Sequence, residues 1–136
     1  MTRAVYRSAS EIHMTNDQGE GVTLLKVSCL LTRRSDLTHE QFFRYWTEKH
    51  TPMLATPDPA APKVYRYVQL HPIPDTVTAL KTAPFDGVAE IWFESLEDAA
   101  AMFTSEHYNT VVAKDEENFL DRSKTVFLYA NEKTII

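Results

Sequence analysis

The sequence predicts an α+β domain of the split βαβ, or ferredoxin-like, type, in which two helices cover one face of a four-stranded antiparallel sheet. Three observations predict this fold. Strand-like and helix-like segments follow one another in the order β, α, β, β, α, β. The strand-like segments alternate in polarity, and each helical region opens with capping-box residues. At 136 residues the chain is long enough for one domain with a substantial core.

The domain is predicted to span residues 22–136, after a flexible N-terminal tail at residues 1–21. The tail is polar and aperiodic, and it ends in two glycines at Gly19 and Gly21, which favours irregular structure. The chain shows neither the apolar core of a signal peptide nor a stretch long enough to span a membrane. We therefore expect a cytoplasmic protein without a membrane partner.

The first helix is predicted from about His39 to His50. Thr38 and Gln41 have capping-box spacing at its start. Because the residue before a proline is disfavoured in the helical conformation, Pro52 predicts that the helix ends beside His50. A histidine at a helix C-terminus either caps the last carbonyl groups or serves as a titratable group of a site.

The other elements follow from alternation, capping residues and prolines. Ser95 and Asp98 repeat the capping spacing and open the second helical region. Strands are predicted at residues 22–32, 64–71, 88–94 and 125–130, a second helical piece at about 107–119, and a loop at residues 52–62, which contain four prolines.

Alternation divides the strand residues into a more apolar set and a more polar set. We assign the apolar set to the helix-covered face: Leu25, Val27, Cys29, Leu31, Val68, Leu70, Ala89, Ile91 and Phe93. The open face then carries Lys26, Ser28, Tyr65, Tyr67, Gln69, His71, Glu90 and Trp92, joined by Phe127 and Tyr129. Such a face is too aromatic for solvent and too polar for a dry core. We predict that a second copy of the chain covers it, which gives a homodimer with a small-molecule cavity.

Composition excludes several classes of function. The net charge of −5 and the lack of a basic run argue against nucleic-acid binding. Cys29 is the only cysteine, and the five histidines lack metal-ligand spacing with one another. Three glycines form no phosphate-binding or dinucleotide motif. We therefore expect neither a metal nor another cofactor.

Four segments together resemble the EthD-domain family. They are F-F-R-Y-W-T-E-K-H from Phe42 to His50, Y-V-Q-L-H from Tyr67 to His71, D-G-V-A-E-I-W-F from Asp86 to Phe93, and D-E-E-N-F from Asp115 to Phe119. The resemblance implies a dimeric α+β barrel with a cavity beneath the first helix. It also implies small-molecule chemistry, since relatives include dehydratases and cyclases of aromatic polyketides and proteins tied to the degradation of small organic compounds.

The resemblance marks five candidate catalytic residues: His50, His71, Tyr67, Glu90 and Asp86. Substrate contacts are expected from the open face and the first helix, through Trp46, Phe42, Tyr65, Gln69, Trp92 and Lys26. Each candidate also has a plainer interpretation. A tyrosine can simply pack, a histidine before a proline can lie at the surface, and an Asp-Gly pair can form a turn. A carboxylate in mid-strand, as at Glu90, needs a partner or a raised pKa.

These residue types favour cofactor-free acid–base catalysis, and hence a lyase, cyclase or isomerase. His50 or His71 would remove a proton from an activated carbonyl or polyketide-like compound. Tyr67 would donate a hydrogen bond to the developing oxyanion, and Glu90 or Asp86 would orient the imidazole. Two alternatives stay open: a non-catalytic small-ligand-binding protein, and a monooxygenase of the dimeric α+β barrel type, either cofactor-free or with His50 or His71 ligating haem.

Asp115 and Glu116 are interpreted as a solvated helix face, with the alternative that one of them reaches a basic group across the domain.

Overall fold

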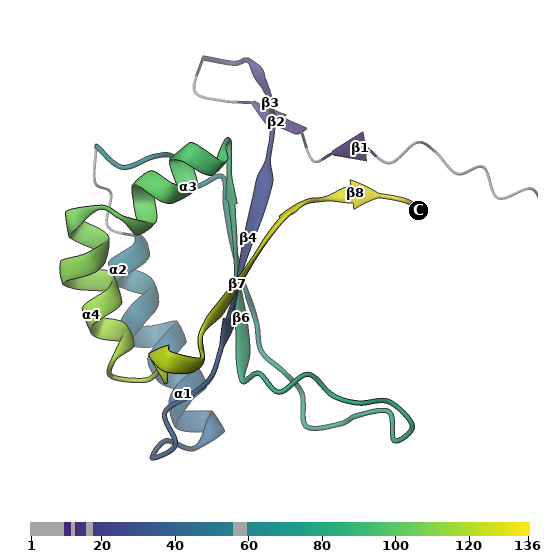
Figure 1. The fold of residues 1–136 in the computed structure, drawn as a ribbon, viewed down its shortest axis with the longest axis vertical. Coiled ribbons are helices and arrows are strands. Elements are labelled where there is room, and N and C mark those ends of the chain that lie inside the picture. Colours follow the sequence, from purple (N-terminus) through teal and green to yellow (C-terminus); the bar gives the residue numbers. More distant parts are fainter. Residues whose placement is uncertain (1–9, 12, 16–17, 56–59) are drawn as a thin grey trace, which may run out of the picture.

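A computed structural model of the protein describes residues 10–11, 13–15, 18–55 and 60–136. Its centre is a four-stranded sheet in the spatial order β5-β6-β4-β7, with antiparallel pairing between all neighbours. The strands are β4 (Leu25–Leu31), β5 (Arg66–Leu70), β6 (Gly87–Phe93) and β7 (Val126–Asn131). The helices gather on one side of the sheet (Figure 1). The predicted α+β, ferredoxin-like arrangement is confirmed.

The first helical region is longer than predicted. It comprises α1 (His39–Tyr45), the π-turn η1 (Trp46–His50) and α2 (Thr51–Ala55). The backbone N–H of Thr51 donates to the carbonyl of Trp46, five residues earlier. A proline in an α-helix clashes with the carbonyl four residues before it. The π-turn, which is wider than an α-helical turn, ends at His50, two residues before Pro52. The helix therefore passes through Pro52, and the predicted helix end at His50 is wrong.

Both predicted capping sites are present. The Thr38 side chain accepts from the Gln41 backbone N–H at 3.1 Å, and Gln41 Oε1 accepts from the Thr38 N–H at 2.8 Å. Ser95 Oγ accepts from the Asp98 N–H at 3.1 Å and opens α3 (Leu96–Phe103). A second π-turn, η2 (Tyr108–Val112), leads into α4 (Ala113–Glu116), and the 3-10 turn η3 (Arg122–Lys124) precedes β7.

The main core lies between the helices and the sheet, where Phe42, Trp46, Phe93 and Phe119 are almost completely buried. Gly87, at the start of β6, lies directly beneath the Trp46 ring. A Cβ atom at this position would come within 2.7 Å of the indole, which is closer than real Cβ contacts. The close approach of the first helix to the sheet therefore depends on this glycine.

Strand register corrects the predicted assignment of faces. Residues directly opposite each other in an antiparallel pair lie on the same face. Tyr67 pairs with Ile91 and Gln69 with Ala89, so these polar residues lie on the helix side. Val68 and Leu70 pair with Glu90 and Val88 and lie on the open face. Phe127 and Tyr129 pair with Cys29 and Val27 and belong to the helix side as well.

His71 also lies on the helix side, because its ring stacks on Trp46. Within β4 and β6 the predicted faces hold, and Lys26, Ser28, Glu90 and Trp92 share the open face through their pairing. Alternation was therefore correct within each strand. It was wrong about how β5 and β7 face relative to the centre of the sheet.

Short strand pairs flank the sheet. β1 (Ser10–Glu11) pairs with β8 (Lys133–Thr134), and β2 (His13–Thr15) pairs with β3 (Gly21–Thr23). The predicted strand at residues 22–32 is thus divided between β3 and β4. The predicted tail, residues 1–21, lies partly outside the described residues, and its flexibility stays a prediction.

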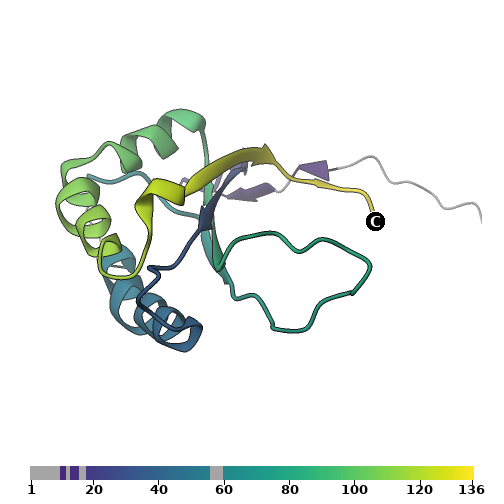
Figure 2. The same ribbon diagram turned by 60° about the horizontal axis from the view of Figure 1, so that its bottom comes forward.

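The long connection from β5 to β6, residues 71–86, extends away from the helices, toward the same side as β8 (Figure 2). It borders the open face of the sheet. None of the helices in the described ranges is long and apolar enough to cross a membrane.

Candidate functional site

A buried histidine and a buried aspartate form the centre of the candidate site. His50 lies in the π-turn η1 and Asp115 in α4, 65 residues later, and they are 4% and 7% exposed. His50 Nδ1 and Asp115 Oδ2 are 2.9 Å apart. Because a carboxylate can only accept, this contact places the Nδ1 proton toward Asp115 and leaves Nε2 to exchange a proton.

Asp115 is held as a carboxylate by three donors. Besides His50, the hydroxyl of Tyr45 donates to Oδ1 at 2.6 Å and the side-chain amide of Asn118 donates at 3.1 Å. Burial favours the protonated form, but the hydrogen bonds outweigh it and hold the pKa of Asp115 below its ordinary value. The interpretation of Asp115 as a solvated residue is therefore wrong, and the alternative of a basic partner across the domain is the one observed.

His50 lines a small cavity between the helices and the sheet, with a volume of about 40 Å³. Tyr67 reaches this cavity from β5. Its hydroxyl accepts from Gln69 Nε2 at 3.0 Å and also from the Trp46 side chain, whose indole can only donate. Burial raises the pKa of Tyr67. Since both acceptor positions of the oxygen are in use, the phenol keeps its own proton for a ligand.

Glu116 lines the same cavity, and its pKa is shifted in the opposite direction to that of its neighbour Asp115. Its carboxylate accepts from the Tyr108 hydroxyl at 2.9 Å and lies 3.5 Å from Nε of Arg122. Burial raises the pKa of Glu116, although the Tyr108 hydrogen bond and nearby cations oppose the shift. Adjacent carboxyl groups whose pKa values move in opposite directions are typical of paired acid and base groups.

His71 lies next to this site but outside the cavity lining. Its ring stacks on Trp46 at 4.9 Å and on Phe43 at 4.8 Å, and its Nε2 is 2.9 Å from Gln69 Oε1. Burial lowers the pKa of His71. Through Gln69 it is linked to the Tyr67 hydroxyl, so it can orient that group without lining the cavity.

The two carboxylates predicted for catalysis lie elsewhere. Glu90 is on the open face, 2.5 Å from Lys26 Nζ. Asp86 accepts from the backbone N–H of Arg33 at 2.9 Å and lies 2.9 Å from Nε2 of His39. The structure thus brings His50 and Tyr67 together and separates both from Glu90 and Asp86.

The residues predicted to contact substrate also fall into a group near the cavity and a group on the open face. Trp46 lines the cavity, Phe42 is core, and Gln69 hydrogen-bonds to Tyr67. Lys26 and Trp92 lie on the open face, where the Lys26 ammonium is 5.4 Å from the indole centroid. Tyr65 packs against the Trp92 cluster and lines a neighbouring surface pocket.

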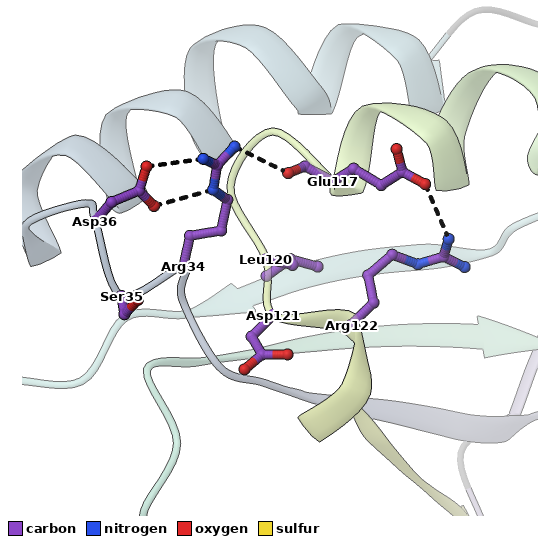
Figure 3. A pocket seen from close by; sticks show the side chains of 7 residues that line it. All are labelled: Arg34, Ser35, Asp36, Glu117, Leu120, Asp121 and Arg122. Atoms are coloured by element: carbon purple, nitrogen blue, oxygen red, sulfur yellow. Dashed lines mark hydrogen bonds and ion pairs between the residues drawn. The ribbon is translucent and has the colours of Figure 1, made fainter.

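A larger groove lies next to this cavity, and Leu120 lines both. It has a volume of about 660 Å³ and is lined by charged side chains that mostly pair with one another (Figure 3). Arg34 makes a two-pronged contact with Asp36 at 2.7 and 3.0 Å and donates to the Glu117 carbonyl at 3.2 Å. With its charges already neutralised and its surface open to water, this groove offers no activated group. Among the described residues, no cluster of three or more His, Cys, Asp or Glu could hold a metal ion.

The fold and this cavity define an α+β protein of the ferredoxin-like type with a buried histidine–aspartate pair between its helices. The EthD domain model matches residues 34–123, and the chain belongs to the EthD-domain family. The match contains both His50 and Asp115. No curated protein matches the sequence.

Solved structures support the same fold. An EthD family protein from Bacillus halodurans superposes with a TM-score of 0.60 at 13% identity, covering 81% of this chain and 99% of that chain. An EthD-like protein from Ralstonia eutropha gives 0.55 at 18% identity, covering 79% and 89%. A dimeric protein of unknown function and ferredoxin-like fold from Bacteroides fragilis gives 0.57 at 12% identity, covering 79% and 95%. At these identities the similarity concerns the fold.

Proposed function

We propose that this protein is a small-molecule enzyme that dehydrates, cyclises or isomerises an activated carbonyl or polyketide-like compound by acid–base catalysis without a cofactor. The observation that carries the proposal is the buried His50–Asp115 pair, whose histidine lines a small cavity that Tyr67 and Glu116 also line. Ion pairs at a protein surface are exposed to water, whereas both members of this pair are buried. A buried pair beside a cavity with perturbed carboxyl groups is a recognised mark of a functional site.

His50 acts as the base. Asp115 fixes the ring through Nδ1 and favours the imidazolium that forms when Nε2 takes a proton. The C–H bond next to the substrate carbonyl breaks, its electron pair forms an enolate, and the proton moves to His50. Tyr67 donates a hydrogen bond to the enolate oxygen.

Glu116 acts as the acid in a dehydration. Burial raises its pKa, and in the protonated form the carboxyl protonates the departing hydroxyl, which leaves as water while the enolate collapses to the enone. The carboxylate then recovers a proton from imidazolium or solvent. One acid–base step supplies roughly 10²–10⁴ in rate, or about 3–5 kcal/mol, so the substrate C–H must already be activated.

The test is turnover of a panel of aromatic β-hydroxyketones, followed by the absorbance of the enone product. His50→Gln is expected to lower kcat by about 10²–10⁴, and Tyr67→Phe by about 10²–10³. Glu116→Gln is expected to remove the alkaline limb of the pH profile. The matched control is His39→Gln, because His39 is exposed and its partner Asp86 lies outside the cavity.

Equal turnover in the His50 and His39 variants would show that His50 is not the base. Compounds that bind without conversion at any pH would favour the non-catalytic ligand-binding protein instead.

We also propose that the open face of the sheet forms a homodimer interface. Leu70, Val126 and Leu128 are 45%, 47% and 56% exposed there, on the same face as the Lys26–Glu90 ion pair. Exposed apolar surface of this kind favours association. The Bacteroides fragilis neighbour, which shares the fold, is described as dimeric.

Light scattering after size exclusion tests the dimer. Leu128→Glu is expected to produce monomers. Leu96→Glu is the control, since Leu96 is similarly exposed, at 59%, but begins α3 on the helix side. A dimer unchanged by Leu128→Glu would place the interface elsewhere.

A further inference from the structure

We propose that a surface pocket between α2, the start of β5 and α3 is the substrate's docking site, and that an uncharged, largely apolar compound passes from it into the cavity between Leu54 and Met102. This inference rests on the proposed function and names the substrate class for the same site. The pocket has a volume of about 340 Å³ and is lined by Thr51, Leu54, Val64, Tyr65, Arg66, Tyr67, Ile91 and Met102.

Volume is the first argument. The inner cavity of about 40 Å³ holds His50 but is too small for an organic ring system. Small-molecule sites in proteins usually measure about 300–1,000 Å³. The outer pocket, at about 340 Å³, reaches that range. Substrate therefore has to occupy the outer pocket and extend into the inner cavity.

The two spaces share a wall, which is the second argument. Leu54, Tyr67, Ile91 and Met102 line both. Ile91 is buried in the central strand β6, whereas Leu54 and Met102 are half-buried and come from the helices. Methionine has three rotatable side-chain bonds, and rotation of these two side chains is a small movement that leaves the sheet unchanged.

Tyr67 distinguishes this pocket from a second pocket nearby. A second pocket of about 350 Å³ shares Leu54, Met102, Tyr108 and Val112 with the inner cavity, but Tyr67 does not line it. That second pocket carries Lys63 and His107 instead. A carbonyl compound entering from the first pocket meets the phenol of Tyr67 at the wall, before it reaches His50.

The lining of the docking pocket sets the substrate class. Leu54, Val64, Ile91 and Met102 supply an apolar surface. The hydroxyl of Thr51 is engaged, donating to the Trp46 carbonyl at 2.9 Å and accepting from Gln69 at 2.9 Å.

The one cation in this lining does not offer a ready anion site. The guanidinium of Arg66 lies over the Trp92 ring, 4.7 Å from its centroid, on the open-face side of β5. An anionic substituent would be desolvated in this pocket without a dedicated partner.

Stopped-flow binding of 2-naphthol, compared with 2-naphthol-6-sulfonate, tests both parts of the inference. The sulfonate is expected to bind at least about tenfold more weakly. Leu54→Trp is expected to slow association of 2-naphthol by about tenfold or more. Met53→Trp is the matched control, because Met53 neighbours Leu54 on α2 and lines the second pocket but not the docking pocket. It is expected to leave the rate within about twofold.

If Leu54→Trp does not fold, Leu54→Ala is expected to speed association several-fold. Equal rates for the Met53 and Leu54 variants, or equal affinity for both probes, would overturn the inference. These binding measurements need no turnover. If the acid–base proposal fails and this inference holds, Leu54→Trp still slows the association of 2-naphthol, but no compound is converted.

Discussion

Replacing Asp115 by alanine tests the buried pair most directly. The change removes the acceptor of His50 Nδ1, at 2.9 Å, and of the Tyr45 hydroxyl, at 2.6 Å. A hydrogen bond to a charged group typically contributes about 1.5–3 kcal/mol, and orphaning a neutral buried donor costs about 1–3 kcal/mol. Tyr45 is only half-buried and can bond to water instead. We therefore expect a loss of about 3 kcal/mol in the free energy of unfolding, or roughly 10 °C in Tm.

The assay is urea denaturation at one fixed protein concentration, with the slope of the transition checked for constancy. Asp36→Ala is the matched control. Asp36 contacts Arg34 at 2.7 Å, as close as the buried pair, but its side chain is 59% exposed. The decrease in the free energy of unfolding of Asp36→Ala is expected to be a small fraction of that of Asp115→Ala, because solvent screens the Arg34–Asp36 pair. Equal losses in the two variants would refute the argument that burial makes the His50–Asp115 contact important.

Four further predictions follow from individual contacts. Gly87→Ala is expected to cost about 1–3 kcal/mol in urea, because its Cβ would come 2.7 Å from Trp46; Gly21→Ala, which has nothing within 4 Å, is the control. The pKa of Asp115 is lowered in the folded protein. The stability that its carboxylate contributes is therefore present above its ordinary pKa of 3.8 and is lost as the pH falls through its pKa in the folded state. The stability gap between the wild type and Asp115→Asn should thus close in acid, and a constant gap down to acid unfolding would contradict this. Burial, with the Glu116 charge, raises the pKa of Cys29 to about 12. Its thiol should react with an aromatic disulfide reagent at pH 8 only after unfolding, and rapid reaction of the native protein would exclude a buried position. Proton NMR should show His71 titrating below its ordinary pKa of 6.5, whereas a normal or raised value would mean that its stacked position is not populated.

Local interactions explain what could be predicted well. The capping pairs at Thr38 and Ser95 involve residues three apart, so their geometry needs no tertiary contact. The order of strands and helices likewise follows from periodicity along the chain. His50 and Tyr67 were recognised through motifs that resemble the family. The D-E-E-N-F segment belonged to the same resemblance and could have pointed to Asp115, but Asp115 was interpreted as part of a solvated helix face.

The errors arose where distant segments meet. Pro52 was expected to end the helix beside His50, but the helix continues past a π-turn, and His50 is buried within it. Glu90 looked like a member of the site because it lies in a motif with Trp92. In the sheet it faces Lys26, on the opposite side from His50.

The sequence by itself determined which residues share a face of each strand, where the helices begin, and that the chain has the ferredoxin-like order of elements. Only the tertiary structure decided which face of β5 meets the helices and which carboxylate meets His50. The physical reason is that strand pairing has a side-chain period of two, so a shift of one residue between distant strands exchanges every side chain from one face to the other. Local patterns carry no information about that shift, and the position of Tyr67 beside the cavity depends on it.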